Sequence, residues 1–161
     1  MNVIAANDSA KTITVMFGGA YSGKYDVKVR HAHEGLLNTS SVVLDVSGSI
    51  DSISPLSGSI YGGTLLTIKG SNFGNVYTDN PVQLQMNEGG VGNLDCFVQT
   101  TNSTTITCLL DQTVTTAGKK VNTLVFLKTS EEATCLGDCI FTFTDTIPTV
   151  TSLVTNWDAS S

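Results

Sequence analysis

The chain has 161 residues, a formal net charge of -6 and only 14% charged residues. Its 40% hydrophobic residues suffice for a core, but none of its apolar stretches approaches the roughly 20 residues of a membrane-spanning helix. Because proteins that bind phosphate backbones need a basic face, the acidic balance argues against nucleic acid as a partner. The residues after Met1 do not resemble a signal peptide, which indicates a mature piece or an excerpt of something longer.

The first 48 residues repeat, in the same order, a pattern that occurs later in the chain. When Ile13 is aligned with Ile106, few residues are identical, but the order of apolar and turn residues is kept. A self-match of this kind indicates a tandem array. The matched positions are Val3 with Cys96, Val15 with Cys108, 23–24 with 118–119, 26–30 with 122–128, and 42–46 with 140–144.

The segment 55–74, PLSGSIYGGTLLTIKGSNFG, has the most specific local pattern in the chain. Leu66 and Ile68 alternate with polar residues, which predicts a strand with one buried face. The glycines before this strand allow backbone angles that other residues resist, and Phe73 follows as an anchor. Seven strands of this kind are predicted, the number that an immunoglobulin-like sandwich requires: 50–54, 64–70, 82–86, 96–99, 105–109, 122–128 and 140–144.

This order of glycines, strand and buried aromatic residue resembles the opening of an IPT/TIG domain (immunoglobulin-like, plexin, transcription factor), as in fibrocystin-like and plexin-like extracellular proteins. The resemblance implies an all-β fold, an immunoglobulin-like (IPT/TIG) β-sandwich in tandem. The opening segment has no counterpart of 55–74, and the stretch 148–153 resembles 49–54. We therefore expect the carboxyl-terminal part of a repeat at 1–48, a complete repeat at 49–146, and the first strand of a following repeat or an inter-subunit tail at 147–161.

All four cysteines lie in the second half of the chain. Cys96 and Cys108 fall on predicted neighbouring strands, where opposed positions can approach within disulfide range. Cys135 and Cys139 enclose only Leu-Gly-Asp, which fits a local staple at a hairpin tip with a modest entropic effect. We expect two disulfides; free buried thiols or a zinc site are the alternatives. A pair similar to Cys96 and Cys108 is also what the IPT-like resemblance implies.

Three glycosylation sequons begin at Asn7, Asn38 and Asn102, all in predicted loops or turns, where acceptors are exposed. Asn7 is the weakest candidate, because Asp8 occupies the middle of its sequon. The alternative is ordinary turn chemistry, which also favours Asn. Together with paired cysteines and low charge, the sequons favour an extracellular setting, secreted or on a cell surface, with N-linked glycans.

The sequence contains no recognisable nucleophile motif, phosphate loop or acid–base pair, and we predict that the chain is not an enzyme. The cluster at His31, His33 and Glu34 is the one metal-like feature. Both imidazoles would lie on the same side of a strand, but no third ligand is identifiable. We therefore predict no catalytic residues, no metal site and no cofactor other than glycans.

The resemblance implies a role through surfaces and stiffness, that of an extracellular structural or adhesive module without membrane insertion in this segment. Its partners would be neighbouring IPT/TIG repeats or other copies of itself, together with surface proteins or glycans. In a sharper hypothesis, the tail 147–154 of one copy adds a strand to the opening segment of the next and builds a head-to-tail filament. The competing interpretation is that both ends are cuts in a longer chain.

Two other classes of function share this fold. A carbohydrate-binding accessory TIG domain of a larger secreted or surface protein would need exposed aromatic platforms, for which the candidates are Tyr21, Tyr25, Tyr61, Tyr77 and Trp157. The dimerisation domain of a Rel-like transcription factor is the other class. Acidic charge, paired cysteines and sequons argue against it.

Overall fold

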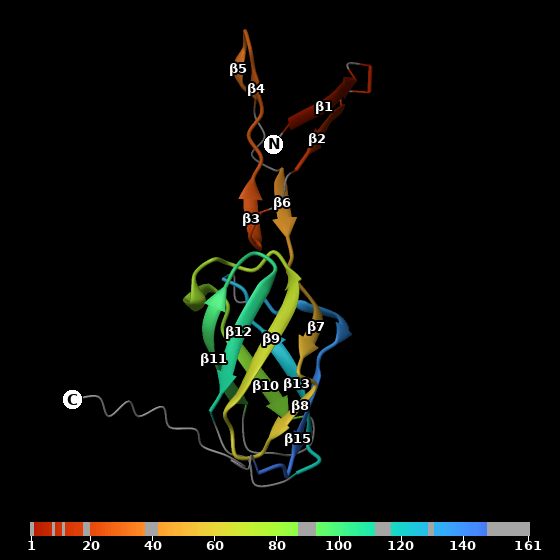
Figure 1. Ribbon diagram of the computed structural model, residues 1–161. Coiled ribbons are helices and arrows are strands. Elements are labelled where there is room, and N and C mark those ends of the chain that lie inside the picture. Colours follow the sequence, from red (N-terminus) through yellow and green to blue (C-terminus); the bar gives the residue numbers. More distant parts are fainter. Residues whose placement is uncertain are drawn as a thin grey trace, which may run out of the picture.

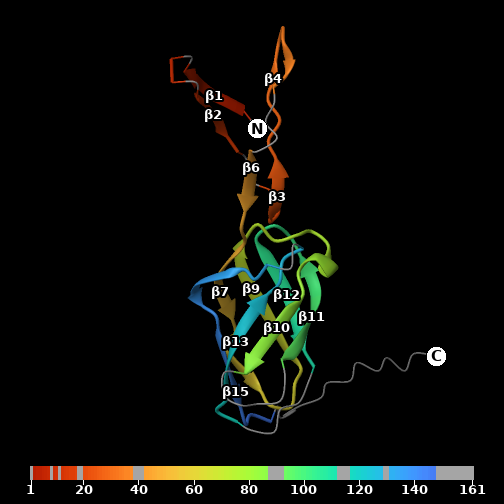
Figure 2. The same ribbon diagram turned by 180° about the vertical axis from the view of Figure 1, so that it is seen from behind.

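The computed structural model shows an all-β protein whose strands divide into an opening segment and a β-sandwich (Figures 1 and 2). The all-β sandwich predicted from the sequence is thereby confirmed. Within the described residues, none of the helical segments has the length and apolar character that crossing a bilayer requires. The structure describes residues 2–7, 9–10, 12–17, 20–37, 42–86, 93–111, 117–128 and 131–147.

The opening segment, residues 2–46, forms two-stranded antiparallel ribbons that project from one end of the sandwich (Figure 1). The first ribbon pairs β1 with β2, and the second pairs β3 with β6. A third pair, β4 with β5, continues the second ribbon, because the Val27 N–H donates to the Val42 carbonyl and the Leu37 N–H to the Val29 carbonyl. The strands are β1 (Asn2–Asn7), β2 (Thr12–Met16), β3 (Gly23–Asp26), β4 (Arg30–His31), β5 (Gly35–Leu36) and β6 (Val43–Val46).

The sandwich is one hydrogen-bonded series of nine strands that curls around a core, in the order β14-β7-β9-β12-β11-β10-β13-β15-β8. Most neighbours are antiparallel, and β10 lies between β11 and β13. The elements are β7 (Ser49–Ser54), β8 (Ser57–Ser59), β9 (Thr64–Ser71), the 3-10 helix η1 (Tyr77–Asp79), β10 (Val82–Met86), β11 (Leu94–Thr101), β12 (Thr105–Leu110), β13 (Lys120–Val125), β14 (Thr134–Asp138) and β15 (Ile140–Thr144).

The first and last strands of the sandwich are each divided between its two ends. β7 and β8 are consecutive in the chain, and so are β14 and β15. β14 pairs in parallel with β7, whereas β15 pairs in parallel with β8 and antiparallel with β13. The outermost strands of the series, β14 and β8, therefore continue β15 and β7 along the chain. As a result, β7 and β8 lie beside β14 and β15, respectively.

All seven strands predicted from alternation are present, with ends that differ by a few residues. β8 and β14 were not predicted. β8 has the sequence Ser-Gly-Ser, and all five residues of β14 are exposed, so neither has the apolar alternation that identifies a strand. Both strands form because the sandwich presents a neighbouring strand edge to them.

The core gathers side chains from both layers. Phe73, Phe141 and Phe143 are its largest fully buried members, and Phe141 and Phe143 meet edge to face with ring centroids 5.2 Å apart. Two glycines of the 55–74 segment explain its pattern. Gly63 has a φ of +80°, which other residues adopt only with strain, and a Cβ on Gly70 would meet the Ser49 carbonyl of β7.

Candidate functional site

The hairpin of β1 and β2 has the same hydrogen-bonding irregularity as the hairpin of β11 and β12 in the sandwich. In the first, Val3 pairs with Val15 and the register shifts before Ala5. In the second, Val98 pairs with Cys108 and the register shifts before the next pair. Both hairpins therefore carry a β-bulge at the same place, which supports their equivalence.

This register corrects one match made from the sequence. Val15 and Cys108 remain equivalent, but Val3 corresponds to Val98 and not to Cys96. The reason is the turn: six residues separate Ala6 from its partner Ile13 in the opening hairpin, whereas four separate the equivalent Thr101 from Ile106. A comparison that keeps one offset across both strands therefore misplaces the first strand by two residues.

The β3–β6 ribbon is equivalent to the β13–β15 pair of the sandwich. Tyr25 lies opposite Leu44 in the ribbon, as Val121 lies opposite Phe141 in the sandwich. In β15 the buried residues alternate along the strand, whereas in the β3–β6 ribbon only Gly23 and Val46 are buried. The strands β1, β2, β3 and β6 of the opening segment can therefore be compared with β11, β12, β13 and β15.

The apolar residues of β2 are exposed at positions where the sandwich has buried ones. In the sandwich, every residue of β12 pairs with a residue of β9, and both strands contribute to the core. Among the described residues, no strand other than β1 pairs with β2. The equivalent pairs, with exposed fractions, are Ile13 (48%) and Ile106 (0%), Val15 (39%) and Cys108 (0%), and Phe17 (38%) and Leu110 (3%).

Backbone and side-chain contacts fix the base of the opening segment to the loop after β9. The Ser22 N–H donates to the Asn72 carbonyl at 2.8 Å, and Nδ2 of Asn72 donates to the Ser47 carbonyl at 2.8 Å. Asn72 has a φ of 60°, in the left-handed region that Asn tolerates better than most residues. Ser22 and Val46 are both buried at this junction. The ribbon is therefore attached by specific bonds as well as by the chain.

Two side-chain contacts surround this junction. Nδ2 of Asn75 donates to the hydroxyl of Tyr21, and Nζ of Lys24 lies 4.0 Å from Oε1 of Glu131. The ion pair is exposed at both partners, so water screens it and its contribution to stability is small.

The structure contains a buried disulfide between Cys96 of β11 and Cys108 of β12, with Cα atoms 5.4 Å apart. The same pair was expected from the sequence. The exposed fractions are 3% for Cys96 and 0% for Cys108. This bond therefore fastens the hairpin whose opening-segment counterpart has Val15 in place of Cys108.

A second disulfide joins Cys135 and Cys139, again the expected pair. The prediction that it staples a hairpin tip is wrong, because β14 pairs with β7 while β15 pairs with β13. The bond therefore links Cys135 of β14 to the residue before β15, where the chain passes from the edge of β7 to the edge of β13. The carbonyl oxygen of Gly137 lies 3.1 Å from Sγ of Cys135, inside this small loop.

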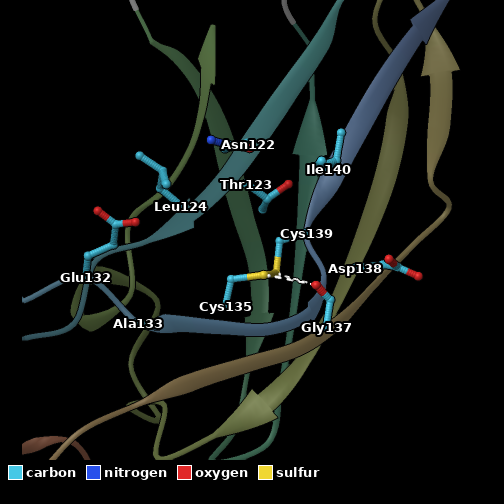
Figure 3. A pocket seen from close by; sticks show the side chains of 10 residues that line it. All are labelled: Asn122, Thr123, Leu124, Glu132, Ala133, Cys135, Gly137, Asp138, Cys139 and Ile140. Carbon is cyan, nitrogen blue, oxygen red and sulfur yellow. Dashed lines mark hydrogen bonds between the residues drawn. A yellow bond between two sulfur atoms is a disulfide. The ribbon is translucent and has the colours of Figure 1, made fainter. Parts of the chain in front are cut away.

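A pocket of about 300 Å³ lies beside this disulfide (Figure 3). It occupies the space between β13 and the segment that carries β14, where that segment turns away to pair with β7. The hydroxyl of Thr123 is buried there without a hydrogen-bond partner among the described residues. Glu132 and Asp138 contribute carboxylates to the lining, but no group of metal-ligating residues occurs in the described part of the chain.

Two of the sequon asparagines lie at equivalent hairpin turns. Asn102 is exposed between β11 and β12, and its Oδ1 accepts bonds from the N–H groups of Thr104 and Thr105. Asn7 ends β1, and its Oδ1 accepts a bond from the Ala10 N–H. Turn chemistry thus uses the oxygen of each side chain, whereas a glycan would attach to the nitrogen. Asn38 lies outside the described residues.

The remaining candidates do not form a common site. His31 ends β4 and His33 lies in the following turn, with ring centroids 6.1 Å apart, so the two are not on one strand as expected. Nδ1 of His31 lies 3.8 Å from a carboxylate oxygen of Glu34. The exposed tyrosines occupy separate segments: Tyr21 and Tyr25 in the opening segment, Tyr61 between β8 and β9, and Tyr77 in η1. Trp157 lies outside the described residues.

A family model described as IPT/TIG domain matches residues 49–143. None of the curated proteins compared with the chain matches it. Similar solved structures include a structural genomics protein of unknown function from Bacteroides thetaiotaomicron VPI-5482 (21% identity, TM-score 0.49) and the plexin A4 full extracellular region (19% identity, TM-score 0.48). The aligned regions cover 61% and 70% of this chain, and 22% and 11% of those chains.

Proposed function

The chain belongs to the IPT/TIG domain family, and from this membership we propose that it is an extracellular structural or adhesive module whose opening segment joins it to a neighbouring repeat. The observation that carries the proposal is the repeated hairpin, with its β-bulge at the same place in both copies. We divide the chain accordingly into the carboxyl-terminal part of one repeat (1–48), a complete repeat (49–146), and the first strand of a further repeat or a tail (147–161).

The junction supports a mechanical role. The loop after β9 fixes the base of the opening segment through Ser22, Ser47 and Asn72. A tandem array whose units are held by such bonds resists bending between repeats, whereas a flexible linker would not. Such a module acts through its length and its surfaces, a role that requires no catalytic group.

Disulfides and sequons support the extracellular location. Disulfides persist in oxidising compartments and are rare in the cytosol. The turn at Asn102 exposes the side chain and leaves its nitrogen without a bond to the described residues, since all its hydrogen bonds use Oδ1. The turn at Asn102 is therefore compatible with a glycan on this side chain.

The location is tested by the intact mass of the chain secreted from a eukaryotic cell, before and after removal of N-glycans and before and after reduction with alkylation. We expect a glycan mass that decreases in Asn102→Gln, and four alkylated cysteines only after reduction. Thr100→Gln, two residues before Asn102 in β11 and outside the sequon, is the matched control. Unmodified asparagines together with free thiols in the secreted chain would contradict an extracellular module.

A more specific version of this proposal is a head-to-tail filament, in which the tail of one copy adds a strand to the opening segment of the next. Light scattering of the full chain between micromolar and hundred-micromolar concentration tests it. A mass that grows with concentration supports the filament. A monomer throughout this range would exclude the filament but would leave the tandem module intact.

A further inference from the structure

The strand β14 lies between two points at which the chain is fixed to β13. On one side, the Ala133 N–H donates to the Val125 carbonyl at 2.8 Å, and on the other the Thr123 N–H donates to the Cys139 carbonyl at 2.8 Å. Ala133 and Cys139 are both buried. Between them the chain leaves β13 and pairs in parallel with β7. Any movement of β14 is therefore confined to the residues between these two anchors.

Few interactions hold β14 on the edge of β7. All five of its residues are exposed, so it buries no apolar side chain. Its parallel ladder is interrupted by a register shift between Cys135 and Asp138. Parallel pairs are slightly less stable per residue than antiparallel ones, and segments with few buried apolar contacts open locally at low free energy. The backbone bonds by themselves therefore hold β14 weakly.

The disulfide between Cys135 and Cys139 restrains this weakly held strand. It ties an exposed residue of β14 to the buried anchor, with only three residues between the two cysteines. In the closed loop, Gly137 approaches β7 so nearly that a Cβ on it would meet the carbonyl oxygen of Asp51. A short covalent loop removes many of the conformations that β14 would gain by leaving β7. The bond thus stabilises the paired position of β14.

We propose that the Cys135–Cys139 bond is a redox switch, whose reduction by a dithiol releases β14 from β7 while the rest of the sandwich stays folded. Cys135 offers an exposed end to the reductant, whereas Cys96 and Cys108 are both buried. The inference goes beyond the proposed function, and it uses neither the opening segment nor the location of the chain.

The exchange follows ordinary thiol–disulfide chemistry. A thiolate of the dithiol attacks Sγ of Cys135 and forms a mixed disulfide, while the bond to Cys139 breaks and Cys139 leaves as a thiolate that takes up a proton. The second sulfur of the dithiol, also as a thiolate, then attacks the first and closes the disulfide of the reagent. Cys135 leaves as a thiolate and is protonated in turn. The protein gains two electrons and two protons, which the dithiol loses.

Release of β14 changes which strand forms this edge of the series. Among the described strands, β14 pairs with β7 on one side and β9 pairs with it on the other. β14 is an irregular, fully exposed edge that carries the carboxylate of Asp138, and such features discourage pairing with other chains. β7 is six residues long and contains the buried Ile50 and Ile53. The reduced chain therefore presents a longer strand edge, and the pocket of Figure 3 loses one wall.

Amide exchange of the full chain, followed residue by residue by NMR, tests the switch in the oxidised, dithiol-treated and reoxidised protein. The most direct probe is Thr134, whose N–H donates to the Gly48 carbonyl at 3.0 Å. We expect its exchange to become about tenfold faster or more on reduction, because β14 then opens locally, and to slow again on reoxidation. Exchange in β9 and β12 should stay slow throughout. Alkylation of a parallel sample shows which cysteines were reduced.

Two variants separate the effect of the bond from that of the strand. Replacing Cys135 and Cys139 by alanine should give the fast exchange at Thr134 permanently, and the dithiol should then have no further effect. Leu136→Ala, exposed on the same strand with the bond intact, is the matched control and should keep the slow exchange of the oxidised chain.

Three results would overturn the proposal. The first is equal exchange at Thr134 in the oxidised and reduced chains, which would mean that the bond does not control the strand. The second is loss of protection in β9 and β12 on reduction, because the bond would then hold the whole sandwich. The third is exchange that stays fast after reoxidation, since the change would not be reversible. None of them depends on secretion, glycans or filament formation.

Discussion

Asn80 holds the backbone of Gly74 at both of its polar groups. The Gly74 N–H donates to Oδ1 of Asn80 at 2.8 Å, and Nδ2 of Asn80 donates to the Gly74 carbonyl at 2.8 Å. Nδ2 also lies 3.0 Å from the hydroxyl of Thr101, which itself donates to the Gly74 carbonyl at 2.7 Å. Asn80 is completely buried. One amide side chain therefore closes the loop that leads from β9 to β10.

Asn80→Ala should lower the free energy of unfolding by about 2–4 kcal/mol, because it leaves the buried N–H of Gly74 without its partner and the Gly74 carbonyl with the Thr101 hydroxyl alone. Urea unfolding followed by far-ultraviolet circular dichroism measures the change. Thr78→Ala, in the same loop but exposed, is the control and should change stability by about 0.5 kcal/mol or less. Equal effects of the two substitutions would show that the buried bonds do not stabilise the loop.

Asn72 should control the attachment of the opening segment. Asn72→Gly keeps the left-handed backbone at low cost but loses the bond to Ser47, worth about 1 kcal/mol. Asn72→Ala loses the same bond and adds backbone strain of about 1 kcal/mol or more. Amide exchange at Ser22, whose N–H donates to Asn72, should therefore be fastest in Asn72→Ala and intermediate in Asn72→Gly. Unchanged exchange in both variants would contradict a bonded junction.

The two disulfides should differ in their accessibility to a reductant. The second disulfide is exposed at Cys135 although its partner Cys139 is buried, whereas Cys96 and Cys108 are both buried. Mild treatment of the folded chain with a dithiol, followed by alkylation, should modify Cys135 and Cys139 only. All four cysteines should react once the chain is denatured, which serves as the control. Modification of the buried pair first, or of both pairs together, would argue against this difference.

The two disulfides should contribute similar amounts to the free energy of unfolding. A closed loop of the size between Cys96 and Cys108 is worth about 3 kcal/mol by loop-closure entropy, and the smaller loop about 2 kcal/mol. Replacing each pair by alanines and measuring chemical unfolding tests both values. The buried pair should cost more than its loop entropy alone, because alanines leave a cavity in the core.

Gly137→Ala should disturb the parallel pairing of β14 with β7. A Cβ on Gly137 would meet the carbonyl oxygen of Asp51, which is backbone and cannot rotate away. Crowding of this kind costs about 1–3 kcal/mol. Leu136→Ala is the matched control, since Leu136 is 69% exposed on the same strand. The midpoint of thermal unfolding is measured for both variants. If Gly137→Ala is as stable as the control, Gly137 does not lie against the Asp51 carbonyl.

The Pro55–Gly74 stretch shows which strands a local sequence pattern can predict. Alternation at Leu66 and Ile68 indicates a buried strand face, and both side chains are fully buried in β9. Period-2 alternation is a property of the strand itself, so it can be read without knowing the neighbours. The same reading fails for β14, whose residues are all exposed and whose only reason to be a strand is the edge of β7.

The order of residues by itself determined the sandwich and indicated the two cysteine pairs, and it predicted a repeated unit, because each depends on spacing along the chain. Only the tertiary structure decided which positions of the repeat are equivalent, since register is set by bulges and turn length and not by identity. It also decided that Ile13 is exposed while Ile106 is buried. Burial is a property of what packs against a strand, and two similar hairpins differ in it when only one has its covering strands.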